Sequence, residues 1–344
     1  MGYANPSVNG VKFVEIAISS QSLTEKVLAA MALKAGFFEH VYWSSRSVKS
    51  ALSKFKHADF DLILANDIHT LPLAFRLSHG AKIILDAHEY APREFDDSWK
   101  WRFFLQRYNE FLCNRYIPRV DGMITVCQGI AEEYEKNYGI HPKVVINAPF
   151  YQDLSPNQNH DKVIHMVHHG AAIPSRNIEL MIETMDYLDE RFHLDLILVP
   201  SVQSYIHRLE SMAEKNPRIR ILPPVQMREL PRYINQYDVG IYLLKPNNFN
   251  NWHTLPNKFF EFIQARLAVA IGPSPEMVRL VKQYDCGVVA EDFTPQALAS
   301  KLDQLDRERV NYYKSRSHTA AKDLCFEKSS EVLLALVNKV MGNA

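Results

Sequence analysis

The segment LPNKFFEFIQA, residues 255–265, places Asn257, Lys258 and Glu261 among the apolar residues of a predicted helix. Pro256 suits the first helical position, so Lys258 is expected in the first turn with Glu261 on the same face. A carboxylate there can accept hydrogen bonds from two ribose hydroxyls, while the lysine reaches a phosphate. The alternative is an exposed Lys–Glu pair beside core phenylalanines, and the segment alone leaves both interpretations open.

A second candidate is HHGAAIPSRNIELM, residues 168–181, where Gly170 ends a predicted strand and a helix is expected to begin near Arg176. A glycine lets a ligand approach the backbone closely. A helix N-terminus offers free N–H groups to a phosphate, and an arginine can add a bidentate contact. A plain strand–loop–helix connection with a solvated arginine fits equally well.

Polar side chains also follow three other predicted strands. They are Asp67 and His69 after FDLILA, His88 and Glu89 after KIILD, and Lys245 after DVGIYLL. A histidine at the end of a strand can bind a substrate hydroxyl or stabilise developing charge. With 14 histidines in the chain, a loop histidine bonded to backbone is the alternative for His88. No HExxH or comparable spacing occurs, so no metal site is expected.

Short apolar runs alternate with helical patterns along most of the chain. The expected strands cover residues 60–65, 82–86, 122–127, 143–147, 163–170, 194–200, 218–222, 238–244, 267–272 and 287–291. These runs lack strict alternation, which is typical of parallel strands covered on both faces. Ligands of such sheets bind beyond the carboxyl ends of the strands.

The sequence therefore predicts an α/β protein with two doubly wound, Rossmann-like domains. The first spans residues 1–150 and the second residues 161–325, with a polar linker at 151–160. A last helix at 326–344 is expected to pack back on the first domain.

The charge balance, the cysteine spacing and the lengths of the apolar runs argue against several classes of protein. The 344 residues contain 39 Lys plus Arg and 39 Asp plus Glu, so nucleic acid is not expected as the main partner. The four cysteines form no CxxC pair, which fits a reducing cytoplasm. The N-terminus lacks a signal-peptide layout, and no run of about 18 apolar residues occurs.

The segment SWKWRFFLQRYNEFLCNRYIPR, residues 98–119, is both aromatic and basic. One interpretation is a helix that rests on anionic lipid as a peripheral membrane contact, or receives a lipid-linked acceptor. The alternative is a helix with one face on the core and arginine stems that cover apolar surface.

Four segments together resemble retaining, nucleotide-sugar-dependent glycosyltransferases of the GT-B fold, in the large family-4 group. They are ANDIHTLPLA (65–74), ILDAHEYAPREF (84–95), MITVCQGIAEEYEKNYG with VVINAP (123–149), and LPNKFFEFIQARLAVAIGPSPEM (255–277). The resemblance implies two Rossmann-like domains that face each other across a cleft. The acceptor would bind to the first domain and the nucleotide-sugar donor to the second.

The resemblance also implies roles for individual residues. Glu261 matches the carboxylate that binds the donor ribose, and Gly170 the loop glycine beneath the diphosphate. Arg176 and Lys258 stand where basic residues face the diphosphate, and His88 matches the histidine near the anomeric carbon. The predicted catalytic set is His88, Glu89, Arg176 and Lys258, with Gly170, Lys245, Asn257 and Glu261 for the donor and Asp67, His69 and His253 on the acceptor or sugar side.

Three positions depart from the family pattern. His253 stands where a second glutamate usually lies, eight residues before the ribose-binding one. Ala171 replaces the usual basic residue after the loop glycine, and residues 16–26 stand in for an N-terminal glycine-rich loop.

The implied function is transfer of a sugar from a nucleoside diphosphate to a hydroxyl of a glycan or a lipid-linked acceptor. No cofactor or metal is required, because cationic side chains can stabilise the leaving diphosphate. The expected role is synthesis of a surface polysaccharide (lipopolysaccharide, capsule or exopolysaccharide), in the cytoplasm or at the inner face of the membrane. Two alternatives stay open: a sugar-nucleotide epimerase using Asp67, Glu89 and Glu276, and a non-catalytic scaffold, which His253 and Ala171 favour.

Overall fold

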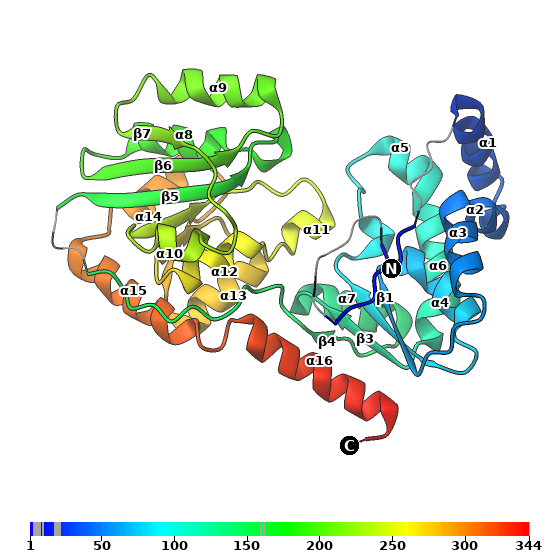
Figure 1. Ribbon diagram of the computed structural model, residues 1–344. Helices are drawn as coiled ribbons and strands as arrows, with labels where there is room; N and C mark the ends of the chain where they lie inside the picture. Colours follow the sequence, from blue (N-terminus) through cyan, green and yellow to red (C-terminus); the bar gives the residue numbers. More distant parts are fainter. Residues whose placement is uncertain (3–7, 9, 17–21, 159, 161, 344) are drawn as a thin grey trace.

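The computed structural model describes residues 1–2, 8, 10–16, 22–158, 160 and 162–343 of the chain. Figure 1 shows two α/β lobes side by side, with the N-terminal lobe on the right and the C-terminal lobe on the left. Each lobe is built on one parallel sheet. The predicted fold class, two doubly wound Rossmann-like units, is confirmed.

The N-terminal lobe contains a four-stranded sheet in the order β1-β2-β3-β4. Its strands are β1 (Leu62–Asn66), β2 (Lys82–Ala87), β3 (Gly122–Thr125) and β4 (Lys143–Val144). Its helices are α1 (Leu23–Lys34), α2 (Phe38–Ser44), α3 (Arg46–Phe55), α4 (Leu71–Leu77), α5 (Trp99–Trp101), α6 (Arg107–Tyr116) and α7 (Gln128–Tyr138), with a π-helical turn η3 (Arg102–Gln106) between α5 and α6. Residues 98–119 were predicted as one helix, and the helical backbone does run without a break from Trp99 to Tyr116, with η3 as a π-helical turn inside it.

The C-terminal lobe contains a six-stranded sheet in the order β10-β9-β8-β5-β6-β7. Its strands are β5 (Ile164–Ala171), β6 (Phe192–Val199), β7 (Ile219–Leu222), β8 (Val239–Tyr242), β9 (Ala268–Ile271) and β10 (Gly287–Val289). Its helices are α8 (Glu179–Thr184), α9 (Gln203–Ala213), α10 (Leu230–Ile234), α11 (Phe249–Trp252), α12 (Asn257–Gln264), α13 (Pro275–Tyr284), α14 (Pro295–Leu302) and α15 (Arg307–Ala320). The strand order reverses between β5 and β8, so the ligand-binding crevice of this sheet is expected at their carboxyl ends.

Successive residues of the central strands pack against helices on opposite faces of the sheet. On β5, Met166 belongs to the apolar cluster that includes residues of α8, α9 and α14. Its neighbour Val167 belongs to the cluster that includes residues of α10, α12 and α13. Burial on both faces explains why these strands are continuous apolar runs in the sequence.

The last helix, α16 (Phe326–Met341), leaves the C-terminal lobe and runs beneath the N-terminal lobe (Figure 1). It packs against β3 and β4. A Cβ atom added at Gly122 on β3 would lie 3.2 Å from Leu336 and 3.3 Å from Val340. Helix α16 thus starts at the C-terminal lobe and packs along the N-terminal lobe.

The two predicted helix starts differ in accuracy. Pro256 is the N-cap of α12, which begins at the next residue, so Lys258 lies in the first turn as predicted. The helix expected near Arg176 begins at Glu179, because the 3₁₀ turn η5 (Pro174–Arg176) ends at Asn177 in a left-handed conformation with φ 47°. No α-helix N-terminus therefore lies at Arg176.

The N-terminal segment was expected to replace a glycine-rich loop. Residues 17–21 of it lie outside the described part of the chain. Ser22 begins α1 with a capping box: its hydroxyl accepts the Glu25 N–H at 3.2 Å, and Glu25 accepts the Ser22 N–H at 2.8 Å.

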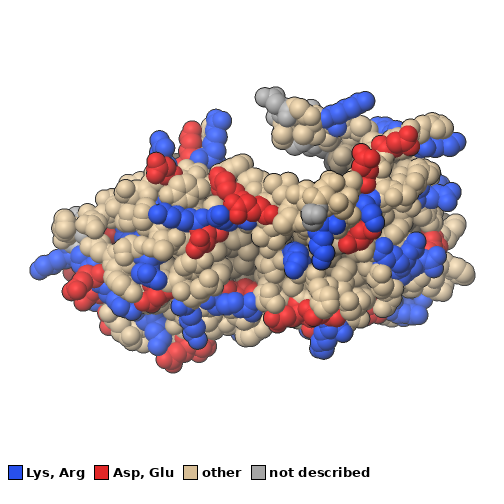
Figure 2. Space-filling model, turned by 90° about the horizontal axis from the view of Figure 1, so that it is seen from below, with Lys and Arg blue, Asp and Glu red and all other residues tan. Residues whose placement is uncertain are grey.

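Charges of both signs are mixed over the face of the molecule seen in Figure 2. No large area of a single sign lies on that face. This matches the zero net charge of the sequence.

Candidate functional site

The central feature of the C-terminal lobe is the approach of Lys258 to Gly170 at the carboxyl end of β5. Gly170 has φ 136°, which residues with a side chain rarely adopt. A Cβ atom added there would lie 3.2 Å from Lys258 Nζ. The glycine therefore permits both the backbone conformation and the close position of the ammonium group.

Lys258 is buried, with 9% of its surface exposed. Its Nζ lies 3.3 Å from His168 Nε2 and 4.7 Å from the centre of the Tyr242 ring. His168 Nδ1 donates to the Ile241 carbonyl at 3.0 Å, which leaves Nε2 to accept from the lysine. Burial and the charge of Lys258 hold the pKa of His168 well below its usual value, so the imidazole is neutral.

Arg176 supplies a second positive charge beside Lys258. Burial, and then the charge of Arg176, lower the pKa of Lys258 to about 7. Burial raises the pKa of Tyr242, and the charge of Arg176 opposes that rise. Arg176 therefore lies near Tyr242, the residue whose ring Lys258 approaches. Arg176 is half-buried, so a buried and a half-buried cation lie together here. Such a pair favours an anionic ligand between them.

Glu261 is the carboxylate of this group and is 4% exposed. Its Oε2 lies 3.3 Å from His169 Nε2. Burial and Lys258 lower the pKa of His169 to about 3, so this contact is not an ion pair. Burial raises the pKa of Glu261 to about 7, while Lys258 acts in the opposite direction. The alternative of an exposed Lys–Glu pair is wrong, because both side chains are buried.

We call Gly170, Arg176, Lys258 and Glu261, with His168, His169 and Tyr242, the cationic cluster. It lies at the reversal of strand order between β5 and β8, since His168–Gly170 end β5 and Tyr242 ends β8. Lys245 and Asn257, also predicted for the donor, are exposed residues outside this buried group. The histidine pair and Tyr242 were missed, although HH at the end of an apolar strand was an available signal.

In the N-terminal lobe, His88 lies between two carboxylates at the ends of β1 and β2. Its Nδ1 is 3.5 Å from Asp67 Oδ1 and its Nε2 is 3.6 Å from Asp86 Oδ2. Its backbone N–H donates to Asp67 Oδ1 at 3.1 Å. The hydrogen bond to Asp67, followed by the charges of Asp86, Asp67 and Glu89, raises the pKa of His88 despite partial burial.

Two other predicted residues, Glu89 and His69, lie close to Asp67. Desolvation, with the nearby carboxylates of Glu94 and Asp67, raises the pKa of Glu89 to about 7. His69 stacks on Tyr108 with ring centres 5.8 Å apart. The structure thus brings Asp67, His88 and Glu89 together as an acidic group in the N-terminal lobe.

Replacing Asp67 by asparagine should lower the pKa of His88. Asparagine tolerates the φ of 61° at this position and removes only the charge. We expect a decrease of roughly one pH unit, measured by NMR titration of the imidazole. His141, which pairs with Glu135 at 2.9 Å, is the internal control. An unchanged His88 titration would contradict the contact with Asp67.

His253 lies where the two lobes meet. Its Nδ1 is 3.3 Å from Glu276 Oε1, and the same oxygen accepts the N–H of Gly129 on α7 at 3.0 Å. Cys127 Sγ donates to the His253 carbonyl at 3.4 Å. The residue that departs from the family pattern therefore takes part in the junction between the lobes.

Replacing Gly129 by alanine should destabilise this junction. The added Cβ would lie 2.1 Å from His253 Nδ1 and 2.5 Å from Glu276 Oε1. We expect a loss of about 1–3 kcal/mol in the free energy of unfolding, measured with urea, although alanine is the better helix former. Gly139→Ala, in open space with φ 67°, is the control and should cost about 1 kcal/mol. A smaller loss for Gly129→Ala would show that the junction is open in solution.

The segment between β8 and α12, which includes α11, forms a second contact between the lobes that was not predicted from the sequence. Phe249 packs on Tyr90 with ring centres 5.2 Å apart, and Asn250 accepts the Tyr90 N–H at 2.8 Å. Asn247 and Asn248 donate to Asp97. A hollow of about 550 Å³ lies between the lobes here, lined by Arg93, Asp96, Asp97, Arg102, Pro246, Asn247, Asn248, Phe249 and Trp252.

Comparison with known proteins identifies the architecture. Residues 22–149 match the family model described as Glycosyltransferase Family 4. Solved structures match both lobes together. The chain has the GT-B fold. No curated protein sequence matches it.

Three GT-B structures illustrate the similarity. TarM of S. aureus, in complex with UDP, fondaparinux and alpha-GlcNAc-glycerol, has TM-score 0.66 and 11% identity over 85% of this chain and 59% of its own. HepE of Anabaena, in complex with UDP, has TM-score 0.66 and 13% identity over 91% and 96%. The sucrose-phosphate synthase of Thermosynechococcus elongatus has TM-score 0.67 and 13% identity over 89% and 79%. This chain thus spans less than two thirds of TarM.

The family model covers only the N-terminal half of this GT-B chain, so it does not reach the cationic cluster. Among the described residues, no group of three His, Cys, Asp or Glu side chains could hold a metal ion. In the same part of the chain, no helix has the length and apolar character needed to cross a membrane.

Proposed function

We propose that this GT-B protein is a glycosyltransferase that moves a sugar from a nucleoside diphosphate sugar to an acceptor hydroxyl. The observation that carries the proposal is the buried Lys258 with the half-buried Arg176 beside it, at Gly170 and close to Glu261. Cations without an equal number of carboxylates suit a diphosphate, and Glu261 suits ribose hydroxyls.

In the proposed reaction the bond between the anomeric carbon and the diphosphate oxygen breaks. A bond from that carbon to the acceptor oxygen forms, and the proton of the acceptor hydroxyl passes to the departing diphosphate. Negative charge grows on the diphosphate, where Lys258 and Arg176 stabilise it without a metal. His88 and Glu89 bind the sugar or acceptor from the N-terminal lobe, and retention of anomeric configuration is part of the proposal.

Lys258 explains why Ala171 can replace the usual basic residue of the glycine loop. Its Nζ reaches Gly170 from α12, so the positive charge that the loop lacks is supplied by the helix. The same observation argues against a non-catalytic scaffold, since a chain that had lost donor binding has no need for a buried lysine there.

The proposed acceptor is a glycan or a lipid-linked glycan, in synthesis of a surface polysaccharide. The proposed location is the cytoplasm and the inner face of the membrane, with contact through residues 98–119. Exposed Trp99 and Phe103 in this segment support that contact.

Isothermal calorimetry with UDP, GDP, ADP and CMP, each beside its parent nucleoside, tests the donor site. HepE is known with UDP and with UDP-glucose, so UDP is the first ligand. We expect one nucleotide to bind at least about 100-fold more tightly than its nucleoside, because the cations Lys258 and Arg176 meet the phosphates. No binding by any nucleotide would reject the proposal.

Incubation without acceptor distinguishes the transferase from a sugar-nucleotide epimerase, which is the remaining alternative. The selected nucleotide sugar is incubated without acceptor and analysed by NMR. A transferase should leave its configuration unchanged, apart from slow hydrolysis, whereas an epimerase would convert the sugar. Conversion without acceptor would replace the proposed reaction by epimerisation.

A further inference from the structure

Helix α1 presents an apolar face to solvent. Not one of its side chains is buried. Leu23, Val27 and Met31 recur every four residues, and with Leu28 they are 51–78% exposed. A helix of a soluble protein normally buries such a stripe against its core.

This face continues onto the turn that follows α5. Helix α1 packs along η3, and Lys34 Nζ lies 3.6 Å above the centre of the Phe103 ring. Phe103 is 48% exposed and Trp99 63%. Figure 1 shows α1 and α5 at the same end of the N-terminal lobe. We call Leu23, Val27, Leu28, Met31, Trp99 and Phe103 the α1–α5 face.

Positive charges surround the α1–α5 face. Lys26, Lys34, Lys100 and Arg102 are exposed. The acidic residue of α1, Glu25, is paired with Arg46 at 2.6 Å. Asp96 is paired with Arg93 at 2.6 Å. Asp97, also exposed, accepts hydrogen bonds from Asn247 and Asn248. The face is therefore apolar at its centre, with a rim in which cations outnumber this carboxylate.

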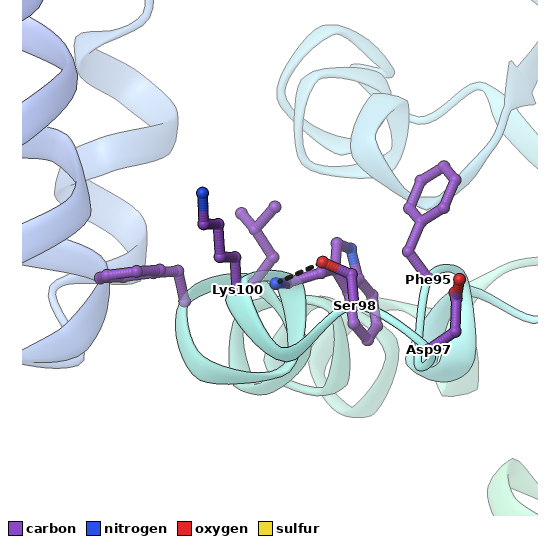
Figure 3. A pocket seen from close by; sticks show the side chains of 7 residues that line it. Phe95, Asp97, Ser98 and Lys100 are labelled. Atoms are coloured by element: carbon purple, nitrogen blue, oxygen red, sulfur yellow. Dashed lines mark hydrogen bonds between the residues drawn. The ribbon is translucent and has the colours of Figure 1, made fainter.

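A hollow of about 440 Å³ lies beside this face. It is lined by Phe95, Asp97, Ser98, Lys100, Trp101, Phe104 and Leu105. Figure 3 shows Lys100 and Ser98 on the helical turn, with Phe95 and Asp97 on the loop before it. Its lining is mostly aromatic and aliphatic, so apolar surface extends from α1 toward the hollow between the lobes.

We propose that the α1–α5 face is a docking surface for an anionic lipid bilayer. Tryptophan, phenylalanine and aliphatic residues enter the interface between headgroups and acyl chains, and lysines meet anionic headgroups. A second copy of the chain fits less well. Two identical faces would bring Lys26, Lys34 and Lys100 of each copy together, which is repulsive.

Docking through this face sets the N-terminal lobe on the membrane. The hollow lined by Trp101 and Phe104 then lies at the depth of lipid headgroups, open to an amphiphilic acceptor. This consequence rests on the proposed glycosyltransferase function, whereas the docking itself does not.

Vesicle co-sedimentation tests the docking. Vesicles of phosphatidylcholine alone are compared with vesicles in which roughly a third of the lipid is phosphatidylglycerol. The apolar variant is Leu28→Ser with Met31→Ser. Its matched control, Leu334→Ser with Met227→Ser, removes the same residue types at 59% and 64% exposure elsewhere on the chain. The charge variant is Lys26→Glu with Lys34→Glu, matched by Lys282→Glu with Lys322→Glu.

We expect wild type and both controls to bind the anionic vesicles only. The apolar variant should lose at least about tenfold in partitioning, and the charge variant about fivefold or more for each lysine. Equal binding by variants and controls, or no binding by wild type, would overturn the proposal. A dimer in light scattering that the apolar variant abolishes would assign the face to a second copy instead.

UDP calorimetry on the same proteins separates this inference from the proposed function. Every variant should keep the wild-type UDP affinity, which also shows that it is folded. Vesicle binding without any nucleotide binding would leave the docking surface standing and reject the glycosyltransferase.

Discussion

Glu261→Gln is expected to weaken UDP binding by about 100-fold while the protein stays folded. Hydrogen bonds to a charged carboxylate contribute roughly 1.5–3 kcal/mol each, and a ribose can donate two. Glutamine has nearly the same shape and carries no charge. Because burial already raises the pKa of Glu261 to about 7, removing the charge should not lower the free energy of unfolding. Calorimetry gives the affinity, and urea unfolding the stability.

The ligand series makes this prediction specific to the ribose. Wild type should bind UDP more tightly than 2′-deoxy-UDP, and Glu261→Gln should bind the two alike. Glu210→Gln, an exposed residue on α9, is the matched control and should behave as wild type. A variant that still prefers UDP over its 2′-deoxy form would place the ribose elsewhere.

The strands of both sheets could be predicted because they are buried on both faces. KIILD and LDLILVP contain the uninterrupted apolar runs IIL and LILV, without alternation, and they became β2 and β6. Apolar runs of that length between helical patterns leave few alternatives to a parallel strand. The reversal of strand order also follows from two successive sets of βα units.

The burial of the donor residues could not be predicted. In sequence, Lys258 and Glu261 look like any exposed helical pair, because a pattern shows only which residues share a face. Their burial depends on β5 and β8, which bring His168 and Tyr242 next to the lysine. His168 on β5 lies 90 residues before Lys258 in the chain. Contacts between distant segments leave no local signal.

Helix α1 could not be predicted from hydrophobic periodicity. Helix α1 has apolar residues on all sides, as in LTEKVLAAMALK, so it has no periodic contrast between a buried and an exposed face. The contact of Phe249 on α11 with Tyr90 could not be predicted either, because the asparagine-rich sequence around Phe249 predicts a turn and not a helix that packs on the other lobe.

The second large effect is expected in the pH dependence of UDP binding. In the free protein, burial and Arg176 lower the pKa of Lys258 from 10.5 to about 7. A bound diphosphate favours the ammonium form and raises this pKa again. Between these two pKa values the free lysine is mostly neutral and the bound lysine charged, so binding takes up a proton. UDP affinity should therefore fall as pH rises above 7, by up to about tenfold per pH unit.

Calorimetry at pH 8 in two buffers with different ionisation enthalpies measures that proton directly. Wild type should take up close to one proton per UDP, since the second phosphate group of UDP, with pKa about 6, is already ionised. Lys258→Arg keeps its charge at all these pH values, so it should take up none and bind with an affinity that does not change with pH. Lys282→Met, which removes an exposed lysine of α13, should match wild type.

Lys258→Met removes the charge of the lysine altogether. It should bind UDP about 100-fold more weakly than wild type at pH 7 and bind uridine equally well, because only the phosphates meet the lysine. Glu261→Gln should instead lose affinity for both ligands, since both contain the ribose. Loss of UDP affinity alone in Lys258→Met, and of both UDP and uridine affinity in Glu261→Gln, would assign Lys258 to the phosphates and Glu261 to the ribose. If Lys258→Met weakened uridine as much as UDP, the two residues would act only through a shared collapse of the pocket.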